Sequence, residues 1–155
     1  MQESLPERVQ TYLRLHNVMS LASQGDEGVW AAAVFYANDG FAACFLSAPT
    51  SRHCRNLAKD PRASATVNED YADWPDIKGV QMEGIVSVLA GAEEEKARRL
   101  YGAKFPLVGN LAQAPLAIVN ALAKVRWYKF VPERLYFIDN SVGFGHRDEI
   151  DLRRP

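Results

Sequence analysis

The stretch that decides the fold is residues 29–47, VWAAAVFYANDGFAACFLS. Two apolar runs, Val29–Tyr36 and Phe41–Ser47, flank Asn38-Asp39-Gly40, and Asn or Asp before Gly between such runs is a strong hairpin signal. The first run is almost continuously apolar, which is typical of a strand covered on both faces. We therefore expect a β-hairpin at this point of the chain.

On the N-terminal side, Val18–Ser23 predicts a further strand of the same meander. Ser4 and Glu7 have the spacing of a capping box, which predicts that a short helix begins here and occupies residues 5–16. The chain thus opens with a helix and three consecutive strands, and no helix separates these strands.

On the C-terminal side, strands and short helices alternate up to residue 139. Gly84 lies inside one of the strands, where glycine usually marks a bulge. Pro132-Glu133 is interpreted as the turn of a final hairpin. The expected elements are a helix from Pro49-Thr50-Ser51 to Lys59, strands at Ala63–Asn68 and Gly79–Leu89, a helix at Ala92–Lys104, a partly helical stretch at Leu107–Ala123, and strands at Val125–Val131 and Arg134–Asp139.

This order predicts a mainly β fold with short helices: a six-stranded antiparallel split β-barrel with peripheral helices. A parallel α/β sheet would need a helix after each strand, and the first three strands have none. We expect one domain over residues 1–155, with the barrel at 18–139 and a tail at 140–155.

Composition narrows the function classes. The 155 residues carry a net charge of −1 with a pI near 6.3, which gives no overall electrostatic footprint for nucleic acid. The N-terminus lacks the apolar core of a signal peptide, and no apolar run is long enough to cross a bilayer. We expect a cytoplasmic protein with neither a membrane nor a nucleic-acid partner, in which Cys44 and Cys54 are structural.

The most informative segment for chemistry is Ser47–His53, where a strand ends and a helix begins. Free N–H groups at a helix start attract anions, and an arginine can grip a phosphate with two parallel hydrogen bonds. Thr50 and Ser51 add hydroxyl donors beside Arg52. The pattern favours a phosphate pocket, although an ordinary N-capped surface helix would give the same residues.

The small residues Ala31–Val34 indicate a second feature. A strand of small side chains lets a flat ring lie against it while backbone groups bond the polar edge of the ring. Close packing of a buried strand is the alternative explanation. Metal spacing among the three histidines, a P-loop, a GxGxxG turn and a GxSxG elbow are all absent, so the sequence predicts no metal site and designates no catalytic residue.

In order and spacing, these pieces resemble the pyridoxamine 5′-phosphate oxidase-like split-barrel superfamily of FMN-binding proteins. The narrower likeness is to a small bacterial branch of it whose function is uncharacterised. The stretches that carry the likeness are Val34-Phe35-Tyr36, Asp39-Gly40, Phe45-Leu46-Ser47, Ser51-Arg52-His53, Leu57, Asp60-Pro61-Arg62, Gly79-Val80-Gln81, Gly84, Tyr101, Phe105-Pro106, Asp139-Asn140 and Gly143-Phe144-Gly145.

The resemblance implies a homodimer that holds two FMN cofactors at its interface, and thus a flavoprotein that acts as a flavin-dependent oxidoreductase. The phosphate-holding stretch of the family falls on Ser51, Arg52 and His53, with Thr50 beside it. The cofactor-binding residues implied by the resemblance and by the two segments above are Ala32, Ala33, Val34, Ser47, Thr50, Ser51, Arg52, His53 and Gln81.

The chain also departs from the oxidases of that superfamily. His53 stands where they have lysine, so a permanent positive charge is lost near neutral pH. Residues 29–34, VWAAAV, replace their Arg-x-Val-Leu-Leu-Lys strand, and Gly145-His146-Arg147 only faintly matches their substrate-binding end. These differences argue against pyridoxamine phosphate oxidation and predict weaker FMN binding.

Two other hypotheses stay open. Some split barrels of this kind bind haem instead, and the candidate axial ligands here are His146 and His16. The other hypothesis is a non-catalytic dimer without cofactor, in which the apolar stretch Leu107–Ala123 serves as an interface. The substrate and the electron donor cannot be deduced from the residues.

Overall fold

The computed structural model describes residues 2–153. Its strands are β1 (Val18–Gly25), β2 (Gly28–Phe35), β3 (Ala37–Asp39), β4 (Ala42–Ser47), β5 (Arg62–Asn68), β6 (Lys78–Val88), β7 (Arg126–Asp139) and β8 (Arg147–Asp151). Its helices are α1 (Leu5–Leu15), α2 (Arg52–Lys59), α3 (Gly91–Lys104), α4 (Pro106–Gly109) and α5 (Leu116–Leu122), with single 3₁₀ turns η1 (Trp74–Asp76) and η2 (Leu111–Gln113).

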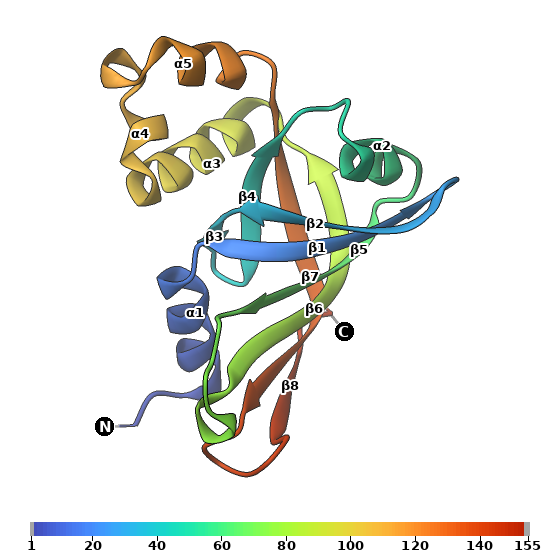
Figure 1. The fold of residues 1–155 in the computed structure, drawn as a ribbon, viewed down its shortest axis with the longest axis vertical. Coiled ribbons are helices and arrows are strands. Elements are labelled where there is room, and N and C mark those ends of the chain that lie inside the picture. The colour runs from blue at the N-terminus through green and yellow to red at the C-terminus, as the bar shows by residue number, and fades with distance from the viewer. Residues whose placement is uncertain (1, 154–155) are drawn as a thin grey trace.

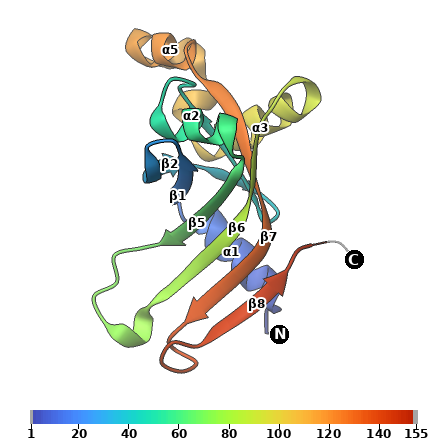
Figure 2. The ribbon, with the colours of Figure 1, turned by 90° about the vertical axis from the view of Figure 1, so that its right-hand side faces the viewer.

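The strands form one curled antiparallel sheet in the order β2-β1-β5-β6-β7-β4-β3, and β8 adds to β7. Figure 1 shows β1 and β2 crossing in front of the long β6 and β7, and Figure 2 shows the curl from the side. This sheet confirms the expected mainly β, split-barrel architecture, with eight strands in place of six. Two of the eight, β3 and β8, are short.

Helix α1 covers the open side of the curl and completes the core. Ser4 and Glu7 form the expected capping box, and the stripe Val9, Tyr12 and Leu13 is buried against the sheet. Arg8 donates to the buried carboxylate of Asp139 at 2.7 Å, which ties the helix to β7.

Helix α2 closes one end of the barrel, and a buried polar contact fixes its position. Asn56 Nδ2 donates to Ser23 Oγ of β1 at 3.1 Å, and both residues are almost inaccessible. Gly25 lets the helix come this close, because a Cβ there would lie 2.1 Å from Asn56 Oδ1. The helix start, and with it Ser51–His53, is thereby held beside the β1–β2 hairpin.

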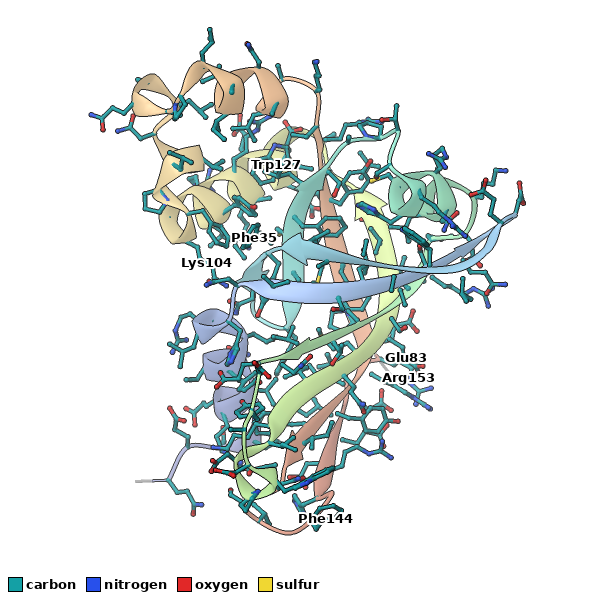
Figure 3. The ribbon with its side chains drawn as sticks, in the orientation of Figure 1. Phe35, Glu83, Lys104, Trp127, Phe144 and Arg153 are labelled. Atoms are coloured by element: carbon teal, nitrogen blue, oxygen red, sulfur yellow. The ribbon has the colours of Figure 1, made fainter. Side chains whose placement is uncertain are left out.

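The chain between β6 and β7 forms a separate layer, which we call the helical lobe (residues 91–122: α3, α4, η2 and α5). Figure 1 shows it beyond one end of the sheet. A small cluster around Ala97, Tyr101 and Trp127 joins it to the barrel, and Figure 3 shows Trp127, Phe35 and Lys104 near this junction.

Four expectations about the strands were wrong. The run Val29–Tyr36, expected to pair with Phe41–Ser47 across the Asp39-Gly40 turn, pairs with β1, and the turn joins β3 to β4. Residues 126–139 form one continuous strand, because Pro132-Glu133 makes a β-bulge opposite Gly84, where a missing N–H is tolerated. The tail contains β8. Strand β2 lies at the edge of the sheet among residues 2–153, and most of its side chains are exposed, so its two faces are not covered as expected. No helix in this part of the chain is long and apolar enough to cross a membrane.

Candidate functional site

The start of α2 gathers three of the residues singled out in the sequence. Strand β4 ends at Ser47, and Ser51 caps the helix by accepting from Cys54 N at 3.4 Å while donating to the Ala48 carbonyl at 2.7 Å. His53 Nε2 lies 2.9 Å from Ser47 Oγ and 3.4 Å from Ser51 Oγ. These three side chains form a compact group, which we call the Ser47–Ser51–His53 cluster.

A buried thiol lies directly below this cluster. Burial alone would raise the pKa of Cys54, but hydrogen bonds from His53, Ser51 and Tyr128 outweigh it, so that pKa is lowered. The surroundings of the helix start therefore favour negative charge. Cys54 is almost inaccessible and packs in the main core, which agrees with the structural role expected for it.

Arg52 points away from the cluster, toward the β1–β2 hairpin. Its Nη2 donates to the Glu27 carbonyl at 3.1 Å, its Nε lies 3.5 Å from the Glu27 carboxylate, and its guanidinium carbon lies 4.3 Å from the centre of the Trp30 ring. Arg52 Nε is buried and has no hydrogen-bond partner among the described residues. A buried unpaired donor is costly, so this N–H is suited to an incoming anion.

The sequence did not single out Trp30 and Glu27, which hold the arginine. Trp30 pairs with Ser23 across β1 and β2, so it faces the same side of the sheet as α2. Its 42% exposure is unusual for a tryptophan in a strand. In the sequence, only its position as a tryptophan among the small residues of a strand could have marked Trp30 as part of the site.

The residues expected to face a flavin ring divide between the two faces of β2. Ala33 pairs with Ser20, which pairs with Thr66, which pairs with Gln81. Cross-strand partners share a face, so Ala33 and Gln81 lie on the outer face. Ala32 and Val34 face inward. Thr50 is exposed before the helix start.

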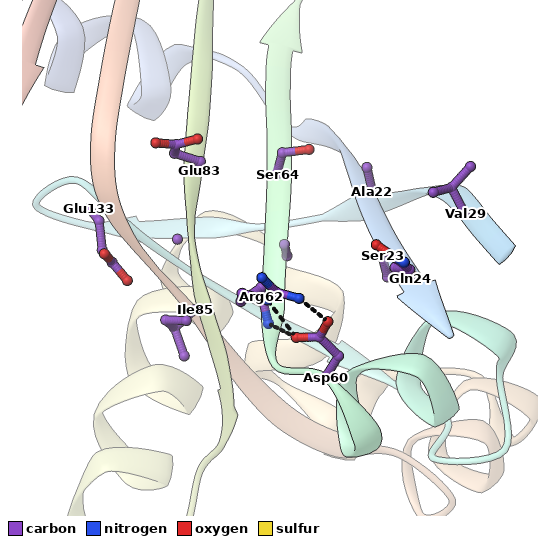
Figure 4. A pocket seen from close by; sticks show the side chains of 12 residues that line it. Ala22, Ser23, Gln24, Val29, Asp60, Arg62, Ser64, Glu83, Ile85 and Glu133 are labelled. Atoms are coloured by element: carbon purple, nitrogen blue, oxygen red, sulfur yellow. Dashed lines mark hydrogen bonds and ion pairs between the residues drawn. The ribbon is translucent and has the colours of Figure 1, made fainter. Parts of the chain in front are cut away.

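The outer face contains two adjoining cavities of about 420 and 350 Å³ that share Ala22 and Ser64. Gln81 lines the smaller one. Figure 4 shows the larger, where Arg62 is engaged by Asp60 through bonds of 3.0 and 2.8 Å, with Glu83 and Glu133 opposite. This outer groove thus has a flat floor of small residues but no uncompensated cation to hold a phosphate.

The two histidines considered as haem ligands are already engaged. His16 stacks on Tyr12, its Nδ1 lies 2.7 Å from the Tyr12 carbonyl, and its Nε2 lies 2.5 Å from Glu69. His146 Nε2 lies 3.0 Å from Asp148 Oδ2. Within residues 2–153, no group of three or more His, Cys, Asp and Glu side chains is placed to hold a metal ion.

Comparisons with known proteins agree with this architecture. The sequence profile described as pyridoxamine 5′-phosphate oxidase matches residues 5–139. A UPF0306 protein of Yersinia pseudotuberculosis is 28% identical over 141 residues, which are 90% of this chain and 88% of that one.

Two solved structures share the fold at low identity. A heme-binding protein from Mycobacterium smegmatis superposes with a TM-score of 0.76 at 23% identity, over 98% of this chain and 60% of its own length. An FAD-binding protein from Mesorhizobium loti gives a TM-score of 0.66 at 18% identity, over 88% of this chain and 94% of its own. Proteins of this fold thus bind either kind of planar cofactor.

Proposed function

Because the chain belongs to the pyridoxamine 5′-phosphate oxidase family, we propose that it binds a flavin nucleotide, FMN, with the phosphate at the start of α2. The observation that carries this proposal is the buried Nε of Arg52, which makes no hydrogen bond and has only the exposed Glu27 carboxylate at 3.5 Å. Arg52 lies between Ser51 and His53 in the first turn of α2.

The donors at this corner fit a phosphate. Ser47 and Ser51 supply hydroxyls, His53 supplies Nε2, and Arg52 supplies a cation held over Trp30. Glu27 is the one carboxylate in contact with Arg52, and its exposed side chain can turn away into solvent. On phosphate binding, Arg52 would leave that carboxylate, turn toward the Ser47–Ser51–His53 cluster and pair with the phosphate through Nε.

The ring would lie along β2. This strand ends the sheet, so the backbone groups on its far side are free to bond the polar edge of a flavin. Ala32, Ala33 and Val34 are small enough to let a flat ring approach, and Gln81 would contribute from the outer face. A bound flavin would supply hydride or electron transfer, and the residues named here would bind and orient it.

We further propose that the cofactor site is completed by a second copy of the chain. Strand β2 exposes Val29 by 78% and Phe35 by 57%, and a large exposed apolar strand is typical of a surface covered by a partner. A homodimer through β2 would cover both the strand and the flavin ring. Sedimentation equilibrium of the purified protein tests this, and a strict monomer would contradict it.

The first experiment is titration of the purified protein with FMN, followed by flavin fluorescence. We expect Arg52→Ala to weaken binding by roughly 10-fold or more, since a charge-assisted hydrogen bond contributes about 1.5–3 kcal/mol. Lys59→Ala, at the other end of α2 where Lys59 pairs with exposed Asp26, is the matched control and should bind like the wild type. Equal affinities for both variants would remove Arg52 from the site.

Haem is the second candidate, favoured by the similarity to the mycobacterial heme-binding protein. Titration with haemin, followed by absorbance, separates the two. If the wild type retains no flavin and shows a saturating spectral shift that disappears in His146→Ala, haem would replace FMN as the proposed cofactor. A shift that survives in both His146→Ala and His16→Ala would exclude these ligands.

A further inference from the structure

The helical lobe exposes apolar side chains that nothing in the described chain covers. Its α4, η2 and α5 contain no buried residue, although α5 has the apolar sequence LAIVNAL. Leu116 is 74% exposed, Leu107 51% and Leu111 40%, and each belongs to a different short helix or turn. Exposed leucines on three consecutive segments favour contact with an apolar phase.

The same region, together with the ten residues that follow it, has an excess of positive charge. Residues 91–132 contain seven Lys and Arg against three Glu, at positions 93–95, a net charge of +4. The rest of the chain contains 11 Lys and Arg against 16 Asp and Glu, a net charge of −5. Such asymmetry indicates a partner that carries negative charge.

Four of the seven cations have partners inside the protein. Lys96 and Lys129 pair with Asp39, Arg98 pairs with Glu94, and Lys104 donates to carbonyls at the end of α1. Arg99, Lys124 and Arg126 are exposed and make no ion pair with any residue from 2 to 153. Arg99 also borders an open groove of about 690 Å³ between α3 and α4, which Val108 and Leu111 line on the apolar side.

These observations discriminate among partners. Two copies meeting lobe to lobe would bring like charges together, so that arrangement is disfavoured. A second copy that covers the lobe with another face is an outcome of the test below. Nucleic acid would satisfy the cations but leave the leucines in water. An anionic lipid surface satisfies both, because its headgroups attract the cations and its acyl boundary accepts apolar side chains.

We propose that the helical lobe, with the residues that follow it up to Arg126, docks on the surface of an anionic lipid bilayer, with Arg99, Lys124 and Arg126 at the headgroups and Leu107, Leu111 and Leu116 at the acyl boundary. The protein would lie on the membrane, since no described helix could span one. This revises the expectation, drawn from the sequence, that the protein has no membrane partner. It is independent of the flavin site, which lies at α2.

Co-sedimentation of the full-length protein with vesicles tests the proposal. We expect the protein to pellet with vesicles of equal parts phosphatidylglycerol and phosphatidylcholine at low salt, and to stay in solution with phosphatidylcholine alone. High salt should release it, because screening weakens the attraction between exposed charges. Failure to pellet with the anionic vesicles, or equal pelleting with both, would overturn the proposal.

Two variants and their controls locate the contact. Arg99→Glu with Lys124→Glu should weaken binding by roughly 25-fold or more, because each cation near such a surface contributes about fivefold. Arg14→Glu with Lys59→Glu makes the same change in net charge on α1 and α2 and should weaken it far less. Leu116→Asp should also release the protein, whereas Val142→Asp, at an apolar position of the β7–β8 loop that is also well exposed, should not.

All four variants change exposed side chains, so each should fold, and retained circular dichroism checks this. If the lobe variants and the control variants bind alike, the lobe is not the docking surface. If Leu116→Asp instead dissociates an oligomer in sedimentation equilibrium without affecting vesicle binding, a second copy covers the lobe and the proposal is wrong.

Discussion

The barrel and the helical lobe are built from similarly apolar sequence, yet they use it in opposite ways. In the barrel, residues such as Tyr36, Phe45 and Phe130 are fully inaccessible, and almost every strand contributes to one core. In the lobe, only Ala97 and Tyr101 are buried, and α5 contributes nothing to the core. The barrel is stabilised by contacts within the chain, whereas the lobe presents its apolar groups outward.

The largest expected effect tests this contrast directly. Phe130→Ala should lower the free energy of unfolding by about 3–5 kcal/mol, because it leaves a cavity among packed side chains. Leu116→Ala, in the exposed part of the lobe, should change it by less than about 0.5 kcal/mol. Urea denaturation of both variants measures the difference. Similar losses would mean that α5 is packed in solution.

A smaller effect is expected at the contact that positions α2. Asn56→Ala removes the donor to Ser23 and leaves a buried hydroxyl without its partner, so we expect a loss of about 1–3 kcal/mol. Asn120→Ala, on the exposed side of α5, is the matched change in the lobe and should be nearly neutral. If Asn56→Ala also lowers FMN affinity, the helix position and the candidate site are coupled.

The smallest expected effect is on the pH dependence of stability, and it concerns Lys104, which links the barrel and the lobe. Burial between α1 and the Tyr36 ring lowers the pKa of this amine to about 8. Between about pH 8 and the ordinary lysine pKa, the unfolded chain binds more protons than the folded one, so stability should rise with pH in this window. Lys104→Met should remove that rise.

The control for this slope is Lys124→Met, which changes an exposed lysine of the same region and should leave the pH dependence intact. Stability is followed by urea denaturation at several pH values from 7 to about 9, below the ordinary tyrosine pKa of about 10. Equal slopes for the wild type and Lys104→Met over this interval would show that Lys104 keeps an ordinary pKa.

The sequence predicted the elements of the fold that local signals specify. The capping box at Ser4, the turn at Asp39-Gly40 and the bulge opposite Gly84 all depend on neighbouring residues, and the structure confirms them. The strand expected before that turn, Val29–Tyr36, pairs instead with β1. The edge position of β2 and the continuity of β7 through Pro132 were mispredicted, because both depend on which strands meet across the sheet. Apolar content alone does not distinguish a covered strand from an edge strand.

The candidate site could be predicted only where it is contiguous in sequence. Ser51 and His53 lie in one helix turn, so their proximity to Ser47 followed from the strand-to-helix transition. The contacts of Arg52 with Trp30 and Glu27 join segments that are far apart along the chain, so no local sequence pattern predicts them. The same is true of the two faces of β2, which depend on register.

The lobe leaves and rejoins the barrel at one place. Val88 pairs with Tyr128, and Leu89 N donates to the Trp127 carbonyl at 2.8 Å. The end of β6 and the start of β7, between which the lobe is inserted, are therefore hydrogen-bonded to each other. The lobe therefore closes a loop whose two ends are already paired, and halving or doubling the length of such a loop alters its closure entropy by only about 0.6 kcal/mol. Changes in the length of α4 and α5, which contain no buried residue, should therefore leave the barrel folded.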